Sequence, residues 1–244
     1  IAAITPIEMT EQLAGRILEA GVPVLIEKPP GVGLEGARRL REAARATGTP
    51  HMISFNRRFA PPLLRARAWM QAGGHTPRHV ISRMLRRDRL EEVFARDTGV
   101  HQVDAVLSVI GAPSRVDGHR EACDGGRVRN ASARIDTADG CHASVVQTPD
   151  VGFVDESMEI LGDGFRIVVD FHTGAVRIDH DGDCVLRWSA ADEDLPMHVV
   201  NGALDETRAF VAGLRGAGLA PTLDEGVTTM EATLAVHEGR TWEA

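Results

Sequence analysis

The sequence predicts a parallel α/β unit followed by an α+β unit with a mostly antiparallel sheet. In the first 55 residues, three short apolar runs without alternation are separated by two segments with helical spacing, which is the pattern of a parallel sheet buried on both faces. After about residue 77, short β-type runs are separated by Asp-Gly and other Gly-containing turns, which is typical of hairpins. We therefore expect two units, residues 1–75 and 76–244, packed closely because no linker of disordered composition separates them.

The first unit is predicted to run strand, helix, strand, helix, strand, and then a further helix. The strands are expected over 1–4, 22–26 and 51–55, and the helices over about 5–20, 34–47 and 63–72. Thr5-Pro6-Ile7-Glu8 is interpreted as a capping box that starts the first helix, with Thr5 at the N-cap and Pro6 at the first helical position. Gly21 and Gly48 are expected to end the first two helices.

The second unit is predicted to be a meander of hairpins interrupted and closed by helices. Its clearest strands are expected at 160–161, 166–171, 176–178 and 185–188, and its helices at about 98–110, 202–215 and 223–238. The last two helices are candidates for packing back against the first unit.

Composition excludes several classes of protein. A formal net charge of −8 argues against a nucleic-acid or anionic-membrane surface, and no apolar run approaches the roughly 20 residues that span a bilayer. No signal-peptide pattern is visible. Cys123, Cys141 and Cys184 are too scattered for a disulfide framework or a zinc cluster, so we expect no metal, and interpret them as reduced, packed thiols of a cytoplasmic protein.

Polar side chains follow all three strands of the first unit. Thr5-Pro6 follows the first strand, Glu27-Lys28 the second, and Asn56-Arg57-Arg58 the third. Ligands of open parallel sheets bind outside the carboxyl ends of the strands, so these groups are expected to line one cleft. Burial would lower the pKa of Lys28 and suit it to proton transfer. Taken alone, Glu27 and Lys28 also fit a solvated pair at a loop entrance.

A Gly-x-Gly-x-x-Gly spacing occurs at Gly31, Gly33 and Gly36. The same spacing in a dinucleotide fingerprint forms the tight turn directly after a strand. Here four residues separate it from the strand, and no acidic residue ends the next strand. A glycine-rich loop before a helix is the favoured interpretation.

A second group of candidate residues lies at 96–104. On one continuous helix, Asp97, His101 and Asp104 fall at i, i+4 and i+7 and would share a face. A carboxylate one turn away could hold His101 in one tautomer with a near-neutral pKa, which suits acid/base catalysis. The alternative is a helix-capping Asp97 beside a partly exposed histidine.

Three motifs in the same order resemble the Gfo/Idh/MocA oxidoreductases (glucose–fructose oxidoreductase, inositol dehydrogenase and relatives). Glu27-Lys28-Pro29 matches the Glu-Lys-Pro signature, and residues 97–113 resemble the Asp-x-x-x-His helix of the second domain. The segment 202–239 resembles the C-terminal helices of that family, so the resemblance covers nearly the whole chain.

The resemblance implies a Rossmann domain followed by an open sheet that serves as an oligomer interface, in a dimer or tetramer. It implies hydride transfer between NAD or NADP and a sugar, cyclitol or similar small substrate. Lys28, His101 and Asp97 would be catalytic, and Arg58 would join Asp97 and His101 in contacting the substrate. The implied cofactor-binding residues are Thr5, Pro6, Glu27, Lys28, Pro29, Asn56 and Arg57.

The chain departs from the family pattern at its start. The family opens with a strand, a glycine-rich turn and a helix, and none of these precedes Ile1. With βαβ units of about 30 residues or more, roughly 70 residues of the pattern are absent. Without that turn, the polypeptide is expected to bind a dinucleotide poorly and to expose a sheet edge. The non-Met start favours an omitted segment over a truncated family member.

A truncated member would have a different function. The alternative to the dehydrogenase is therefore a binding or assembly protein, or a cofactor-free lyase or isomerase that reuses the same residues. A cluster of arginines could also recognise an anionic substrate group, although solvated arginines are the more common case; its members are Arg58, Arg83, Arg86, Arg87 and Arg89.

Overall fold

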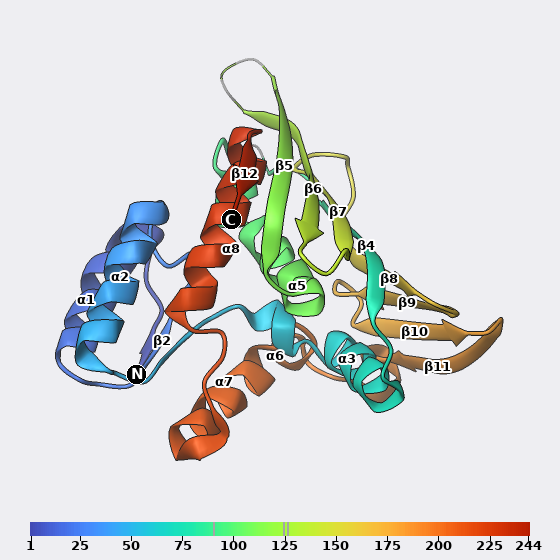
Figure 1. Ribbon diagram of the computed structural model, residues 1–244, viewed down its shortest axis with the longest axis horizontal. Coiled ribbons are helices and arrows are strands. Elements are labelled where there is room, and N and C mark those ends of the chain that lie inside the picture. Colours follow the sequence, from blue (N-terminus) through green and yellow to red (C-terminus); the bar gives the residue numbers. More distant parts are fainter. Residues whose placement is uncertain (90, 124, 126) are drawn as a thin grey trace.

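A small parallel sheet lies at the start of the chain, as predicted (Figure 1). The computed structural model describes residues 1–89, 91–123, 125 and 127–244. Strands β1 (Ala2–Ala3), β2 (Val24–Ile26) and β3 (His51–Ile53) pair in parallel in the order β1-β2-β3. Helices α1 (Ile7–Glu19) and α2 (Leu34–Thr47) connect them, so the strand–helix alternation is confirmed, with strands shorter than expected.

Glycines end both connecting helices, but the predicted start of α1 is wrong. Gly48 caps α2 with a φ of 65°, and Gly21 follows α1 with a φ of 69°, both in the left-handed region that glycine adopts without strain. Pro6, expected at the first helical position of α1, instead occupies its N-cap position, with φ −54° and ψ 145°. The helix therefore starts one residue late, Glu8 cannot close a capping box, and the Thr5 hydroxyl lies 3.0 Å from that of Thr10.

A large mixed sheet forms the rest of the framework. Within the described residues it has nine strands in the order β11-β10-β9-β8-β4-β7-β6-β5-β12. Only the β4–β7 pair is parallel among these described strands. The strands are β4 (Pro77–Leu85), β5 (Pro113–Ala122), β6 (Val128–Thr137), β7 (His142–Thr148), β8 (Asp155–Gly162), β9 (Phe165–Asp170), β10 (Ala175–His180), β11 (Asp183–Ser189) and β12 (Thr241–Glu243). The predicted hairpin meander corresponds to β8–β11.

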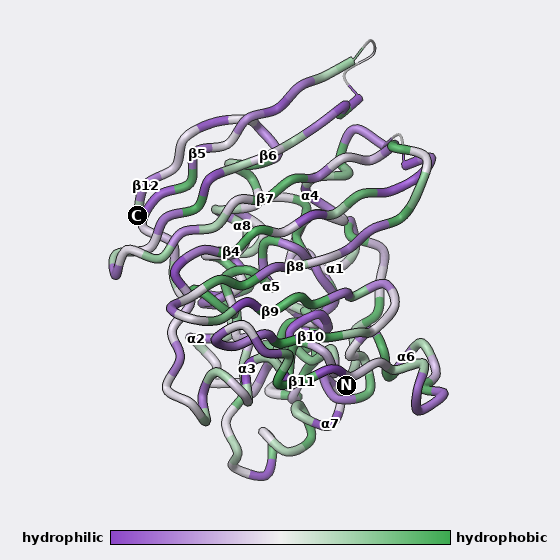
Figure 2. The backbone as a smooth tube through the Cα atoms, turned by 90° about the vertical axis from the view of Figure 1, so that its right-hand side faces the viewer, coloured by the Kyte–Doolittle hydropathy of each residue, from purple (hydrophilic) through white to green (hydrophobic). Residues whose placement is uncertain are grey.

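Helices cover one face of this sheet and leave the other open. Helices α3 (Pro61–Gly73), α5 (Val100–Ile110) and α8 (Leu223–Glu238) contact its strands. Figure 2 looks onto the open face, where no described helix lies over the strands. This face carries charged pairs such as Arg134–Asp136 and Arg177–Asp179. Its use as an oligomer interface stays a prediction.

Helix α8 packs between the two sheets (Figure 1). Its Val227 and Met230 share a core with Leu18 of α1 and Val24 of β2, whereas its Ala235 belongs to the core of the large sheet. The approach to β5 is so close that a Cβ on Gly118 would lie 2.1 Å from the Ala235 carbonyl oxygen. Helix α8 therefore fixes the position of the small sheet relative to the large one.

Helix α7 (Ala203–Ala212) packs back in the same way, on the small sheet. Its Phe210 is buried against Leu25 of β2 and Met52 of β3. At the start of α7, a Cβ on Gly202 would lie 2.1 Å from the backbone oxygen of Asn56, so α7 also touches the 3₁₀ turn η1 (Asn56–Phe59). The short remaining elements are α4 (Phe94–Asp97), η3 (Ala190–Glu193), α6 (Met197–Val200) and η4 (Gly213–Ala217).

The three cysteines do not share one environment. All are free thiols, but only Cys141 is buried; Cys123 is partly buried and Cys184 is exposed. The expectation that all three are packed apolar groups is therefore wrong for Cys184, which lies on β11 at the end of the large sheet. Among the described residues, no helix has both the length and the apolar character needed to cross a bilayer.

Candidate active site at the carboxyl edge of the small sheet

The carboxyl ends of the three parallel strands meet at one edge, where the sequence placed polar residues. Ile4 and Thr5 follow β1, Glu27 and Lys28 follow β2, and the segment 54–56 follows β3. The neighbouring strands are in direct register, with Ala3 paired to Ile26 and Ile26 paired to Ile53. These residues therefore leave the sheet at the same level, as the parallel topology requires.

Lys28 points from this edge toward the second half of the molecule. Its Nζ donates a hydrogen bond of 2.9 Å to the backbone oxygen of Asp97. Burial lowers the pKa of Lys28 below its ordinary value, and nearby Arg57 and Arg89 lower it further, while Glu27 and Asp97 oppose the shift. Lys28 is therefore held in place and partly desolvated, in contrast to the solvated-pair alternative.

His101 lies near Lys28, at the start of α5. Burial lowers its pKa well below the ordinary 6.5, and the charges of Lys28, Arg57 and Arg86 act in the same direction. Its Nδ1 is buried and has no hydrogen-bond partner. The imidazole is therefore neutral at pH 7, and its Nδ1 is not engaged by the protein.

The expected shared helix face of Asp97, His101 and Asp104 is wrong. Asp97 ends α4 and His101 belongs to α5, because the chain breaks at Thr98-Gly99 between the two helices. The Asp97 carboxylate pairs with Arg96 and not with the imidazole. A Cβ on Gly99 would lie 2.3 Å from the side chain of Gln147, so β7 packs directly against this break.

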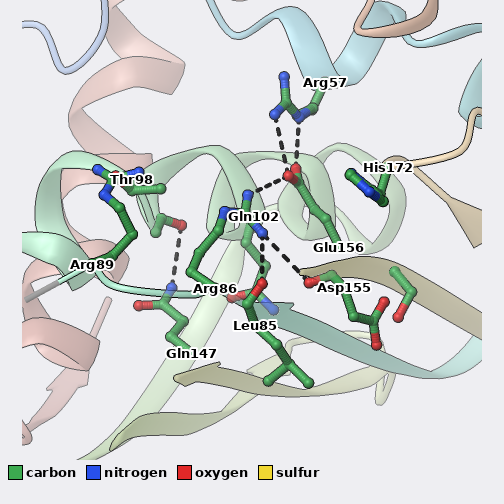
Figure 3. A network of polar contacts seen from close by, with 12 residues as sticks. Arg57, Leu85, Arg86, Arg89, Thr98, Gln102, Gln147, Asp155, Glu156 and His172 are labelled. Carbon is green, nitrogen blue, oxygen red and sulfur yellow. Dashed lines mark hydrogen bonds and ion pairs between the residues drawn. The ribbon is translucent and has the colours of Figure 1, made fainter. Parts of the chain in front are cut away.

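Figure 3 shows a buried network of charges around Glu156, and two of its members, Arg57 and Arg86, lie close enough to His101 to lower its pKa. Glu156 on β8 accepts two hydrogen bonds from Arg57, at 2.6 and 3.1 Å, and also pairs with Arg86. Arg86 also donates to the backbone oxygens of Leu85 and Asp155. The two arginines hold the pKa of Glu156 below its ordinary value against the opposing effect of burial. Arg57 thus joins η1 to the large sheet.

Arg58 points away from this edge. It donates a two-pronged pair of 2.8 Å hydrogen bonds to Asp104 and a third bond to Glu225 of α8. Asp104 is fully buried, and burial raises its pKa to about 6. Because these carboxylates engage Arg58, the structure does not bring it to the group around His101.

A pocket of about 320 Å³ opens at the carboxyl edge, near the lower limit for small-molecule sites. It is lined by Ala2, Ala3, Ile4, Leu25, Glu27, Ser54, Asn56, His101, Ala203, Glu206 and Thr207. No Lys or Arg is among these lining residues. Three of them carry a buried polar atom without a partner: Asn56 Oδ1, His101 Nδ1 and Glu206 Oε1. Buried polar atoms are normally paired, so these three side chains have hydrogen-bonding capacity that the protein leaves unused.

Glu206 is the residue that the sequence did not reveal. Phe210 anchors α7 on the small sheet, and Glu206, four residues earlier, faces the same way. Its side chain is 3% exposed, and its Oε2 accepts a 2.7 Å hydrogen bond from the Ser54 hydroxyl. Burial raises its pKa to about 8, and the charge of Glu27 adds to the rise. A carboxylic acid that stays protonated at pH 7 therefore lines the pocket.

The chain's residues fit one end of a nicotinamide cofactor better than the other. The unpaired atoms in the pocket suit the polar nicotinamide end, and the predicted cofactor residues Glu27 and Asn56 line it. Gly31 and Gly36 do not form a phosphate cradle, because a Cβ on Gly31 would lie 3.1 Å from the backbone of Gly36. The glycine-rich loop is thus packed on the start of α2. Among the described residues, no group of three or more His, Cys, Asp or Glu is placed to hold a metal ion.

Solved structures with a similar fold include several dehydrogenases, although no protein-family model and no curated protein sequence matches this chain. UDP-N-acetylglucosamine 3-dehydrogenase GnnA from Acidithiobacillus ferrooxidans superposes with a TM-score of 0.80 at 24% identity, over 98% of this chain and 77% of that one. Levoglucosan dehydrogenase, in complex with NADH and levoglucosan, superposes with a TM-score of 0.85 at 16% identity, over 100% of this chain and 79% of that one. The dehydrogenase MviM from Clostridium difficile superposes with a TM-score of 0.82 at 17% identity, over 95% of this chain and 76% of that one.

The chain has the Gfo/Idh/MocA two-domain fold. The resemblance inferred from the Glu-Lys-Pro signature and the Asp-x-x-x-His helix is thereby confirmed at the level of fold. In this fold, the edge of the small sheet gathers Lys28, His101 and the pocket, and it leaves Arg58 in a structural cluster. Thr5, Pro6 and Pro29 do not line the pocket, and their role in cofactor binding stays a prediction.

Proposed function

We propose that this chain is part of an NAD(P)-dependent oxidoreductase that acts on a sugar, cyclitol or similar small hydroxylated or carbonyl substrate. The observation that carries the proposal is the meeting of Lys28 and His101, from distant segments, at the carboxyl edge of a parallel sheet. Both have a lowered pKa through burial, and shifted groups of this kind cluster at catalytic sites.

The proposal assigns distinct tasks to the two groups. Neutral His101, which lines the pocket, accepts the proton of the substrate hydroxyl during oxidation and returns it during reduction. Lys28, fixed by its hydrogen bond to the Asp97 carbonyl, directs its remaining N–H groups at the substrate oxygen. When bound, the nicotinamide supplies the hydride acceptor or donor.

The assigned roles limit what the other predicted residues do. Asp97 supports Lys28 through its backbone oxygen, while its carboxylate balances Arg96. Arg57 holds η1 against β8 through Glu156, and so keeps Asn56 at the pocket. The structures with this fold support the reaction class because GnnA and levoglucosan dehydrogenase are dehydrogenases by name, and one contains NADH.

Substitution of Lys28 tests the proposal. Lys28→Met keeps the length of the side chain and removes its charge and its hydrogen bonds. We expect at least a hundredfold loss of kcat for NAD(P)H formation with a polyol substrate, within the range that one acid/base or positioning group contributes. The matched control is Lys28→Arg, which keeps the charge but not the point-like ammonium, and is expected to lose activity without loss of stability.

Two results would contradict the proposal. Unchanged turnover in Lys28→Met would exclude a catalytic role for Lys28. Absence of NADH and NADPH binding by fluorescence, together with a reaction that proceeds without either, would favour the alternative lyase or isomerase.

A further inference from the structure

The pocket at the carboxyl edge is lined by acidic side chains and by no arginine, although arginines lie near its His101. Arg57 and Arg86 share Glu156, and Arg89 and Arg96 pair with Glu91 and Asp97. Each of these guanidinium groups therefore contacts a carboxylate, although Arg57 and Arg86 share a single one. The pocket itself is lined by two carboxyl groups, Glu27 and Glu206, and by no Lys or Arg. An anionic ligand group would find no free cation among these lining residues.

Glu206 has half of its hydrogen-bonding capacity unused. Ser54 donates to its Oε2, whereas its Oε1 is buried and unpaired. A protonated carboxylic acid offers one O–H donor and keeps acceptor capacity. Asn56 Oδ1 adds a second unpaired atom, an acceptor, on the side of η1. A ligand that satisfies both atoms must itself donate and accept.

We propose that Glu206 is a specificity-determining residue, which acts as an uncharged hydrogen-bonding group and selects a neutral ligand group that carries a donor and an acceptor side by side. A vicinal diol of a polyol substrate and the primary carboxamide of nicotinamide share this chemistry. A carboxylate in the same place would meet the carboxyl group of Glu27 and would find no Lys or Arg among the lining residues, so its binding is disfavoured. The proposal rests on the proposed function only for the identity of the ligands, because it concerns binding and needs no hydride transfer.

The proposed role predicts how substitutions of Glu206 rank in their effect on ligand binding. Glu206→Gln keeps a donor and an acceptor without charge, so it should bind like the unsubstituted protein. Glu206→Ala removes both and should weaken binding about tenfold, the equivalent of one hydrogen bond of ordinary strength. A residue needed as an ionised carboxylate would show the opposite, with Gln as damaging as Ala.

The test measures dissociation constants by ligand-observed NMR on the full chain at pH 7, using two matched pairs of probes. These are myo-inositol against glucuronate, and nicotinamide against nicotinate. Binding of the neutral member at least tenfold more tightly than its carboxylate is expected for one pair, and the responding pair identifies which ligand occupies the pocket. Asp205→Asn is the control, because it removes a carboxylate from α7 at a position paired with Arg208 and not among the residues that line the pocket.

Several outcomes would overturn the proposal. These are equal binding of the neutral and anionic probes, binding of neither neutral probe, a Glu206→Ala variant that binds as before, or Gln as weak as Ala. The unfolding temperatures of all variants show whether Glu206→Ala weakens binding by destabilising the fold. The test is separable from that of the proposed function. The proposed function is tested by the turnover of Lys28→Met, whereas this proposal is tested by the binding affinities of the variants with Glu, Gln or Ala at position 206.

Discussion

The protonation of Glu206 makes a quantitative prediction about stability. In the folded chain burial raises its pKa from the ordinary 4.5 to about 8, so the folded state keeps a proton that the unfolded state loses above about pH 4.5. Stability falls with pH wherever the folded state binds more protons. The contribution of neutral Glu206 is therefore fully present below about pH 4.5, and it is lost as the pH rises toward 8.

The size of this effect follows from the two pKa values. Each pKa unit between the folded and unfolded states corresponds to about 1.4 kcal/mol, so the whole window corresponds to about 5 kcal/mol. At pH 7 the loss is about 3 kcal/mol by the same conversion. The Glu206→Gln variant has no such proton to lose. Its free energy of unfolding, relative to that of the unsubstituted chain, should therefore rise by about 2.5 kcal/mol between pH 5 and pH 7, because a small part of the loss has already occurred at pH 5.

Urea unfolding of both proteins at pH 5, 6, 7 and 8 measures this difference directly. Other groups whose pKa is shifted by folding, such as Asp104 with a pKa of about 6, are present in both proteins, so their effects on stability cancel in the comparison. Asp205→Asn is again the control, since its side chain is more exposed and does not line the pocket. Parallel pH profiles for Glu206→Gln and the unsubstituted chain would refute a protonated Glu206.

Three further predictions concern the fold and the rate. Arg58→Met should destabilise the chain by about 3–5 kcal/mol in urea unfolding, because it leaves buried Asp104 without a counter-charge; a loss below about 1 kcal/mol would contradict the role assigned to this pair. Gly118→Ala should lower the unfolding temperature sharply, since the new Cβ meets the Ala235 carbonyl oxygen at 2.1 Å; an unchanged temperature would mean that α8 does not pack so closely on β5. The pH–rate profile should keep its full rate below pH 6.5, because burial and nearby cations lower the pKa of His101 and keep it a neutral base; an acid limb at or above pH 6.5 would exclude that assignment.

The sequence predicted what depends on neighbouring residues. Continuous apolar runs indicated β1–β3, and Gly21 and Gly48 marked the ends of α1 and α2 because only glycine adopts the required φ without strain. The same local reasoning failed at Thr5, where Pro6 delays the helix by one residue. It failed again at Gly99, where contact with a distant strand breaks the helix expected to join Asp97 and His101.

The candidate site was predicted only where the sheet topology determines it. Glu27, Lys28 and Asn56 had to come together because parallel strands end at one edge. Glu206 could not be found in this way. In sequence it is an ordinary acidic residue of an amphipathic helix, and its burial depends on Phe210 packing between Leu25 and Met52, which lie far earlier in the chain.

The charges at this site are arranged at a cost to stability. The arginines near His101 pair with carboxylates that stabilise their burial, as Arg57 and Arg86 do with Glu156. Glu206 has no such partner, and burying it without a cation sacrifices about 3 kcal/mol at pH 7, from its pKa of about 8. A glutamine would occupy the same space without that loss. Since residues that lower stability concentrate where binding or chemistry requires them, the uncompensated carboxyl group is the strongest indication that α7 takes part in the function of this pocket.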